Sequence, residues 1–179
     1  MSTRHAIFAQ SQSGHIGRKG NHPLLWRLKG DLPRFKDLTH DNAMIMGRYT
    51  YMSLPGKLPG RLHVIVSTSL PLSLDLEENL AVVNSLEDAF RLCDQYGYEE
   101  QFVIGGGDLI NQAIPYCHFV HRTVVKDKVD DLSGMALVDL PDQKPYWGRF
   151  RMTKCEVDEN PTHWYETYEQ TQPKEPSKV

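Results

Sequence analysis

The stretch Phe102-Val103-Ile104-Gly105-Gly106-Gly107-Asp108-Leu109-Ile110 joins an apolar run of strand length to a helix pattern through three consecutive glycines. Glycines at such a junction let the backbone approach a ligand closely, and the free N–H groups at the following helix start can bind a phosphate. A tight turn without any ligand explains these residues about equally well. Taken alone, the stretch predicts a strand followed by a helix and leaves the function open.

Apolar runs of strand length recur along the chain, and helix patterns lie between several of them. One such helix opens with Ser85 and Asp88 in the arrangement of a capping box. Strands that alternate with helices predict an α/β fold with a mostly parallel central sheet flanked by helices, in which ligands bind at the carboxyl ends of the strands. The predicted strands are residues 6–9, 43–46, 62–66, 80–83, 102–104 and 119–125.

The C-terminal part of the sequence does not continue the alternation of strands and helices. Residues 151–157 and 163–169 flank a turn signal at residues 158–161, which predicts a C-terminal antiparallel hairpin at one sheet edge. Residues 170–179 are polar and contain proline, so we expect a disordered tail. No linker or repeat divides the rest, which predicts a single domain over residues 1–169.

The composition excludes several classes of protein. Of 179 residues, 40% are hydrophobic and 24% are charged, which is ordinary globular usage and argues against a disordered chain. A formal net charge of −3 gives no general attraction to nucleic acid or to an anionic membrane. The start shows no signal peptide, so we expect a cytoplasmic protein whose Cys93, Cys117 and Cys155 are free core thiols.

Two further strand ends carry polar residues. The run 43–46 leads into Gly47-Arg48-Tyr49-Thr50, and the run 62–66 leads into Ser67-Thr68-Ser69. Side by side in one sheet, such ends would form a cradle for a diphosphate, with an arginine and hydroxyls as partners. Each could equally be a solvated turn, but three coincident polar strand ends favour a dinucleotide.

Asp31 is a carboxylate that projects from the apolar stripe of a predicted helix formed by Leu28, Leu32, Phe35 and Leu38. A carboxylate in that place binds a hydrogen-bond-donating ligand or supports proton chemistry. Asp31 followed by Pro33 also reads as a helix N-cap with proline in the first turn. On the helix alone, the N-cap interpretation is favoured.

In this order, over roughly residues 6–125, the motifs resemble those of the dihydrofolate reductase family. The resemblance rests on Ile16-Gly17, on Trp26 with Asp31-Leu32-Pro33-Arg34-Phe35-Lys36, on Met46-Gly47-Arg48-Tyr49-Thr50, on Leu58-Pro59-Gly60-Arg61, on Val103-Ile104-Gly105-Gly106-Gly107, and on Thr123. It implies a dihydrofolate reductase-like fold and a cis peptide between the first two glycines of the glycine turn. It also implies a mobile lid over residues 14–25.

The resemblance further implies an oxidoreductase of one-carbon metabolism, which reduces 7,8-dihydrofolate to 5,6,7,8-tetrahydrofolate by hydride transfer from NADPH. Asp31 and Trp26 would be catalytic, with Asp31 organising the pterin and supporting protonation at N5. Arg61 would clamp the carboxylate of the substrate's glutamate tail. The substrate-binding residues implied are Ala9, Leu28, Asp31, Phe35, Leu54, Arg61, Ile104 and Thr123. The cofactor-binding residues implied are Ile16, Gly17, Gly47, Arg48, Tyr49, Thr50, Ser67, Thr68, Gly105, Gly106, Gly107, Asp108 and Leu109.

As partners, the resemblance implies dihydrofolate and antifolate inhibitors for a monomer that binds neither nucleic acid nor membrane. Arg48, Ser67 and Thr68 could hold a 2′-phosphate, whereas Asp108 would repel it, so the expected preference for NADPH over NADH is modest.

Two other functions fit parts of the sequence. The related pyrimidine reductase of riboflavin synthesis shares the fold and the cofactor but lacks the helix acid with its flanking tryptophan and phenylalanine. A catalytically silent nucleotide-binding module would keep the glycine turns and lose the acid. Trp26, Asp31 and Phe35 together argue against both alternatives.

Overall fold

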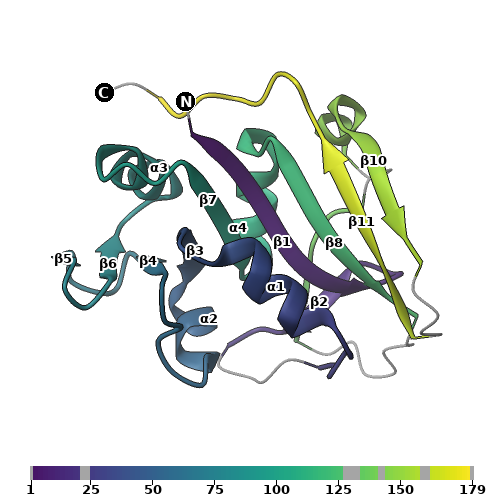
Figure 1. Cartoon of the computed structure of the whole chain (residues 1–179), viewed down its shortest axis with the longest axis horizontal. Helices are drawn as coiled ribbons and strands as arrows, with labels where there is room; N and C mark the ends of the chain where they lie inside the picture. Colours follow the sequence, from purple (N-terminus) through teal and green to yellow (C-terminus); the bar gives the residue numbers. More distant parts are fainter. Residues whose placement is uncertain (1, 21–24, 127–133, 141–143, 158–161, 178–179) are drawn as a thin grey trace.

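The computed structural model describes residues 2–20, 25–126, 134–140, 144–157 and 162–177 (Figure 1). Its strands are β1 (Thr3–Ser11), β2 (His15–Arg18), β3 (Ala43–Gly47), β4 (Leu62–Val66), β5 (Ser73–Asp75), β6 (Leu80–Val83), β7 (Glu100–Gly105), β8 (Phe119–Val125), β9 (Met135–Leu137), β10 (Arg151–Glu156) and β11 (His163–Glu169). Its helices are α1 (Asp31–Thr39), α2 (Arg48–Ser53), α3 (Leu86–Gln95) and α4 (Gly107–Ala113), with short 3-10 helices η1 (Ile114–Tyr116) and η2 (Pro145–Arg149).

The main sheet has the strand order β10-β11-β8-β1-β7-β3-β4-β6-β5. Its six central strands, from β8 to β6, are parallel, and both edges are antiparallel. β3 illustrates the cause, because residues 43–46 are wholly buried and form the continuous apolar run of a strand covered on both faces. The predicted α/β fold with a parallel centre and a C-terminal hairpin is confirmed. The turn predicted at residues 158–161 lies outside the described residues.

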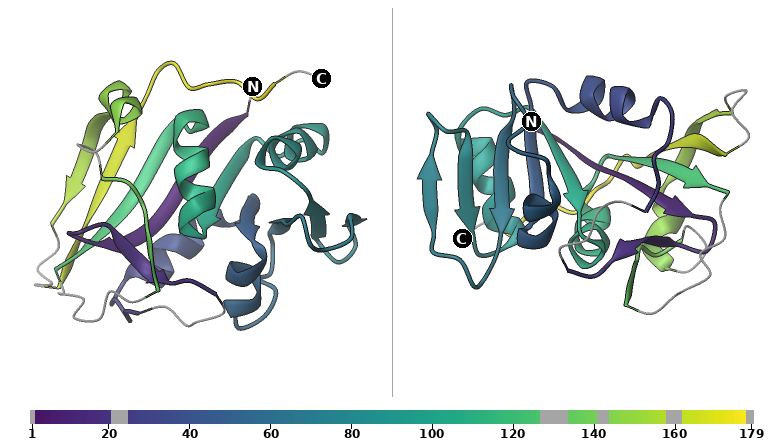
Figure 2. Two further views of the ribbon diagram at one scale, coloured as in Figure 1. Left: turned by 180° about the vertical axis from the view of Figure 1, so that it is seen from behind. Right: turned by 90° about the horizontal axis from the view of Figure 1, so that it is seen from below.

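Helices cover both faces of this sheet. α1 lies on one face and α4 on the other, and the two ends of the described chain lie near each other (Figures 1 and 2). α3 begins as predicted, because the Ser85 side chain accepts a hydrogen bond from the Asp88 N–H at 3.1 Å. Its apolar positions, including Phe90 and Cys93, are buried in the core.

α1 is shorter than its apolar stripe predicted. Gly30 adopts a φ of 88° in the left-handed region and starts the helix at Asp31, so Leu28 precedes it. Leu32 is 66% exposed and therefore belongs to no buried stripe. The stripe was wrong at these two positions because a glycine turn, which the hydrophobic spacing does not register, resets the start of the helix.

One other expectation differs from the structure. Cys93 and Cys117 are buried free thiols as predicted, but Cys155 is exposed on the edge strand β10. Two residues of the C-terminal segment, Gln170 and Glu175, contact the domain. The side chain of buried Gln170 donates to the Cys117 carbonyl oxygen at 2.6 Å, and Glu175 pairs with buried Arg4 at 3.3 Å. Buried polar groups need such partners, which polar composition alone does not reveal.

A pair of buried histidines lies between β1 and β8. The Nδ1 atom of His5 is 3.1 Å from the Nε2 atom of His121, and the His5 ring also stacks on Phe102 at 4.4 Å between centroids. Burial, aided by the charge that His121 would carry, lowers the pKa of His5 to about 3. Burial, aided by the nearby Arg34, lowers the pKa of His121 to about 4. Both rings are therefore neutral in the folded protein at neutral pH.

These depressed pKa values predict acid sensitivity of the fold. An unfolded histidine takes up its proton near pH 6.5, so the stabilisation is complete above that pH and is lost as the pH falls toward 4. Between pH 7 and 5 we expect the free energy of unfolding, measured in urea, to fall by about 2 kcal/mol per ring. The double variant His5→Phe/His121→Leu should lose most of this difference, and the exposed-site control His40→Gln should keep it. An undiminished difference in the double variant would contradict the assignment.

Candidate active site

The carboxylate of Asp31 is anchored to the sheet. Asp31 is the first residue of α1, and its Oδ1 atom accepts a hydrogen bond from the Thr123 hydroxyl on β8 at 2.7 Å. The N-cap position belongs to Gly30, and no side chain caps this helix end. The N-cap interpretation of Asp31 is therefore wrong. The half-buried carboxylate instead reaches across to a strand that is distant in sequence.

The strands beneath Asp31 place further groups beside it. Thr123 pairs with Ala9 of β1 on one side and with Tyr165 of β11 on the other. The Arg34 guanidinium lies over the Tyr165 ring, with its central carbon 4.6 Å from the ring centroid. Asp31, Thr123 and Ala9 thus come together as the resemblance implied, whereas neither Arg34 nor Tyr165 was a candidate.

The remaining apolar candidates are accessible to a ligand. Each is half-buried. Phe35 is on α1, one helical turn beyond Asp31, and Ile104 is on β7 immediately before the glycine turn. The others are Leu28 before α1, Leu54 after α2, and Trp26 in the segment that leads to α1.

Arg61 is held in a cage of oxygen acceptors. Its Nε donates to the Thr39 hydroxyl at 2.9 Å, and its two terminal nitrogens donate to the carbonyl oxygens of Pro59 at 2.9 Å and Lys36 at 3.1 Å. Of the five guanidinium N–H groups, one on each terminal nitrogen is left over. Burial lowers the pKa of Arg61, with the carboxylate of Asp41 opposing the shift. An arginine nevertheless keeps its charge in proteins, so the remaining pair of donors suits a carboxylate.

Three strand ends meet at one edge of the sheet, as predicted. In the register of the parallel strands, Met46 of β3 is opposite Gly105 of β7, and Gly47 is opposite Val66, the last residue of β4. A Cβ atom placed on Gly47 would lie 3.8 Å from the backbone nitrogen of Gly106. The glycine turn, Gly47 and Ser67 therefore border one backbone-lined surface, as a diphosphate cradle requires.

Two glycines of the turn leave no room for a side chain. A Cβ atom on Gly105 would meet the Thr50 hydroxyl oxygen at 2.8 Å, and one on Gly107 would meet the Leu137 carbonyl oxygen at 2.8 Å. The peptide bond between Gly105 and Gly106 is cis, as the resemblance implied. Close packing on both flanks therefore requires glycine here.

Arg48 is positioned by neutral groups near this edge. It donates to the Ser69 hydroxyl at 3.0 Å and to the Tyr49 hydroxyl at 2.8 Å, and it lies over the Tyr49 ring. The Ser67 and Ser69 hydroxyls are 3.2 Å apart. Ser69, which was not among the predicted cofactor residues, thus holds the arginine, whereas Thr68 is exposed. Asp108 is exposed in the first turn of α4, and Leu109 is buried in the core.

The predicted lid includes the strand β2, which contains Ile16 and Gly17. β2 pairs antiparallel with β9. A Cβ atom on Gly107 would lie 3.4 Å from both Ile16 Cδ1 and the Ala136 Cβ, so this strand pair packs on the glycine turn. Lid residues 21–24 lie outside the described residues. The short β2–β9 pair was not predicted, because β2 contains one apolar side chain only and β9 is three residues long.

Asn111 on α4 is a supporting residue that the sequence did not suggest. Its amide nitrogen donates to the Leu137 carbonyl oxygen at 3.1 Å, and its amide oxygen accepts from the Asp139 N–H at 2.9 Å. These two bonds tie the end of β9 to the helix that follows the glycine turn. A lone asparagine in a helix carries no signal that would have identified this role.

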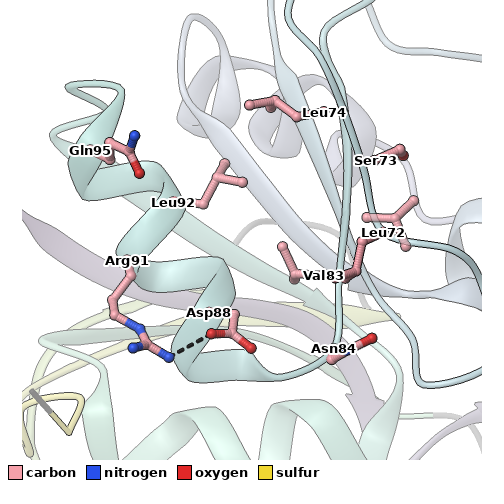
Figure 3. Close-up of a pocket in the computed structure, with 10 residues that line it drawn as sticks. Leu72, Ser73, Leu74, Val83, Asn84, Asp88, Arg91, Leu92 and Gln95 are labelled. Carbon is pink, nitrogen blue, oxygen red and sulfur yellow. Dashed lines mark hydrogen bonds and ion pairs between the residues drawn. The ribbon is translucent and has the colours of Figure 1, made fainter. Parts of the chain in front are cut away.

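An open hollow of about 540 Å³ lies elsewhere, between α3 and the strands β5 and β6 (Figure 3). Leu72, Leu74 and Leu92 contribute apolar side chains to it, and Asp88 and Arg91 in its wall form an ion pair with each other. None of the predicted site residues lines this hollow.

Two classes of site are not found in the described part of the chain. Its histidine, cysteine, aspartate and glutamate side chains form no group of three that could hold a metal ion. None of its helices combines the length and apolar character that crossing a membrane requires.

Comparison with known proteins adds independent findings. The family model for dihydrofolate reductase matches residues 4–170. Dihydrofolate reductase of Mycobacterium tuberculosis is 36% identical over 140 residues, covering 76% of this chain and 80% of that protein. A putative bifunctional dihydrofolate reductase-thymidylate synthase of Oryza sativa is 34% identical over 151 residues, covering 75% of this chain. The chain spans only about 30% of the length of that bifunctional relative.

Among solved structures, a dihydrofolate reductase from Enterococcus faecalis in complex with NADP(H) and RAB-propyl superposes with a TM-score of 0.75. The match covers 95% of this chain and 97% of that one at 26% identity. The anchored helix carboxylate, the glycine turn and the family match over nearly the whole described fold agree with one another. The chain therefore belongs to the dihydrofolate reductase family.

Proposed function

We propose that this protein reduces 7,8-dihydrofolate to 5,6,7,8-tetrahydrofolate with NADPH, and that antifolates bind at the same site. The observation that carries the proposal is the carboxylate of Asp31, held by Thr123 on the same sheet whose strand ends form the glycine-lined edge. A pyrimidine reductase or a silent nucleotide-binding module has no need of this anchored acid. The family match and the structure in complex with NADP(H) support the assignment.

The glycine-lined edge fits a dinucleotide. Gly47 and Gly106 present backbone at a surface with no side chain between them, which lets a diphosphate approach N–H groups closely. Arg48, Ser67 and Ser69 add one cation and two hydroxyls at the neighbouring strand end. When bound, a reduced nicotinamide supplies the hydride.

Asp31 takes the part of the reaction that concerns the proton. The net reaction adds a hydride and one proton to the pterin, so the site must stabilise a protonated or polarised ring. The Thr123 hydroxyl donates to Oδ1 of Asp31 and fixes the orientation of the carboxylate, and the remaining acceptor positions of its two oxygens suit the substrate's amino group and ring nitrogen. Asp31 therefore organises the pterin and supports protonation at N5 without having to donate the proton itself.

Arg61 selects the other end of the substrate. Its two remaining N–H groups form a fork that matches the two oxygens of a carboxylate, and its cage prevents the fork from rotating. A folate tail that ends in glutamate offers such a carboxylate. We further propose that β2 and the rest of the lid close over the nicotinamide, and that the protein acts as a cytoplasmic monomer without nucleic-acid or membrane partners.

Replacing Asp31 by asparagine should reduce turnover of dihydrofolate at neutral pH by about a hundredfold or more, because an amide keeps the shape but lacks the negative charge. The melting temperature should change little. The control Asp37→Asn removes an exposed carboxylate from the same helix and should leave turnover unchanged. Turnover of Asp31→Asn within a few-fold of wild type would refute the catalytic role.

Arg61→Lys tests the carboxylate clamp. Lysine keeps the charge but presents no planar fork, so binding of a folate with a glutamate tail should weaken by about tenfold or more. Binding of a pteridine without the tail should weaken far less, because it offers no carboxylate. Equal weakening of both ligands, measured by fluorescence titration, would show that the substitution acts only through the stability of the cage.

The cofactor preference tests the other strand ends. The ratio of kcat/KM for NADPH to that for NADH should modestly exceed one in the wild type. Arg48→Leu should lower this ratio because it removes a cation that could bind the 2′-phosphate, and Asp108→Arg should raise it because it removes a repelling charge. The control Arg151→Leu, on the distant edge strand β10, should leave the ratio unchanged. A wild-type preference for NADH would contradict the NADPH assignment.

A further inference from the structure

Arg34 is placed where its charge can act on the reacting groups. It lies three residues after Asp31 on α1, so the two side chains occupy neighbouring positions on the helix surface. Its guanidinium packs on the ring of Tyr165, and Tyr165 is directly opposite Thr123, whose hydroxyl holds Asp31. The cation and the carboxylate therefore rest on the same pair of strands, β8 and β11.

Arg34 and Asp31 interact electrostatically and are not in direct contact. These two described side chains form no ion pair within 4 Å, and the Thr123 hydroxyl is bound at Oδ1 of Asp31. Burial lowers the pKa of Arg34, and the charges of Asp31, Glu156 and Tyr165 oppose that shift. The guanidinium is thus close enough to interact electrostatically with the carboxylate without blocking the place where a ligand binds.

The two buried histidines near Arg34, on β1 and β8, add no positive charge to that of the arginine. Burial keeps His5 and His121 neutral, and Arg34 itself contributes to the lowered pKa of His121. His5 Nδ1 and His121 Nε2 are 3.1 Å apart, so one of these two nitrogens donates to the other while both rings are neutral. A neutral pair of rings leaves Arg34 as the charged group at this place.

The charged and titratable groups around the pair are few. α1 contributes Asp31 and Arg34 themselves and the exposed Lys36 and Asp37, and the segment before it contributes the exposed Arg27 and Lys29. The strands of the main sheet contribute His5 (β1), Glu100 (β7), His121 (β8), Glu156 (β10), and His163 with Tyr165 (β11). Glu156 is largely exposed and already pairs with Lys154 at 2.7 Å, so solvent and lysine weaken its effect on Arg34.

We propose that Arg34 is a positioning residue for the reaction at Asp31. The fixed positive charge of Arg34 lowers the pH above which turnover declines. The inference rests on the proposed function. Reduction of the pterin consumes a proton, so turnover must fall when the site can no longer hold one. A nearby cation makes a proton that is held at the pterin nitrogen easier to lose. Arg34 in this way lowers the upper limit of the pH range over which the protein is active.

The test is the pH profile of kcat for dihydrofolate reduction. In Arg34→Met, which keeps an unbranched apolar stem on the Tyr165 ring, the midpoint of the alkaline decline should move upward by about half a pH unit, as expected for one partly screened charge. Arg34→Lys retains the charge and should restore the midpoint to within about 0.2 units of wild type. Lys29→Met removes an exposed cation at a similar sequence distance from Asp31 and should leave the midpoint unchanged.

A binding measurement without cofactor gives a second readout. A 2,4-diaminopteridine bound as a cation should bind to Arg34→Met about threefold more tightly than to wild type at pH 7, because a like charge is gone. Arg34→Gln serves as a second neutral variant if the methionine variant does not fold. An unshifted midpoint in the neutral variants, or an equal shift in Arg34→Lys, would overturn the role of Arg34. Failure of the wild type to reduce dihydrofolate would instead overturn the proposed function.

Discussion

The absence of side chains at Gly105 and Gly107 is the constraint on which the rest of the site depends. At Gly105 it allows the Thr50 hydroxyl, at the start of α2, to approach the end of β7. At Gly107 it allows the backbone of β9 to lie directly on the start of α4, and β2 lies beside β9. This one turn therefore determines both the position of the glycine-lined edge and the packing of the strand pair β2–β9 beside it. A methyl group at either position would displace backbone or a packed threonine, which close-packed interiors resist.

Asp31 depends on a different part of the fold, because it comes from a helix and is fixed by a strand ninety-two positions away in the sequence. Gly30 ends the preceding turn and lets the helix begin with the carboxylate turned toward β8. The parallel register of β1 and β8 then places Ala9 opposite Thr123. The threonine that holds Asp31 therefore has a half-buried apolar residue next to it. The acid is thus positioned by rigid elements, which hold its orientation more precisely than a loop would.

Some parts of this fold and site could be predicted from the sequence, and others could not. β4, β6 and β8 begin and end where their apolar runs predicted, since a strand buried on both faces has few alternatives. The meeting of the strand ends at Gly47, Gly105 and Ser67 was predictable too, because parallel strands share one carboxyl edge. The hydrogen bond from Thr123 to Asp31 was implied only by resemblance, and the interpretation of Asp31 as an N-cap competed with it. Arg34 and Asn111 were missed, and Ser69 was named only as one of three hydroxyls at a strand end. Their contacts join residues far apart in the chain or depend on the direction of a side chain, and neither can be read from residue spacing.

Five arginines of the fold fall into two groups by their partners, and the difference decides which of their charges are matched within the protein. Arg122 is paired with Glu166 at 3.1 Å and Arg4 with Glu175 at 3.3 Å, so the charges of these buried residues are already matched within the fold. Arg61 is held by carbonyl oxygens and a hydroxyl, Arg48 by two hydroxyls, and Arg34 by the face of a tyrosine ring. Neutral partners orient a guanidinium without cancelling it. The site can therefore keep local positive charge despite a net charge of −3, and each such cation remains available to a ligand group or to the carboxylate of Asp31.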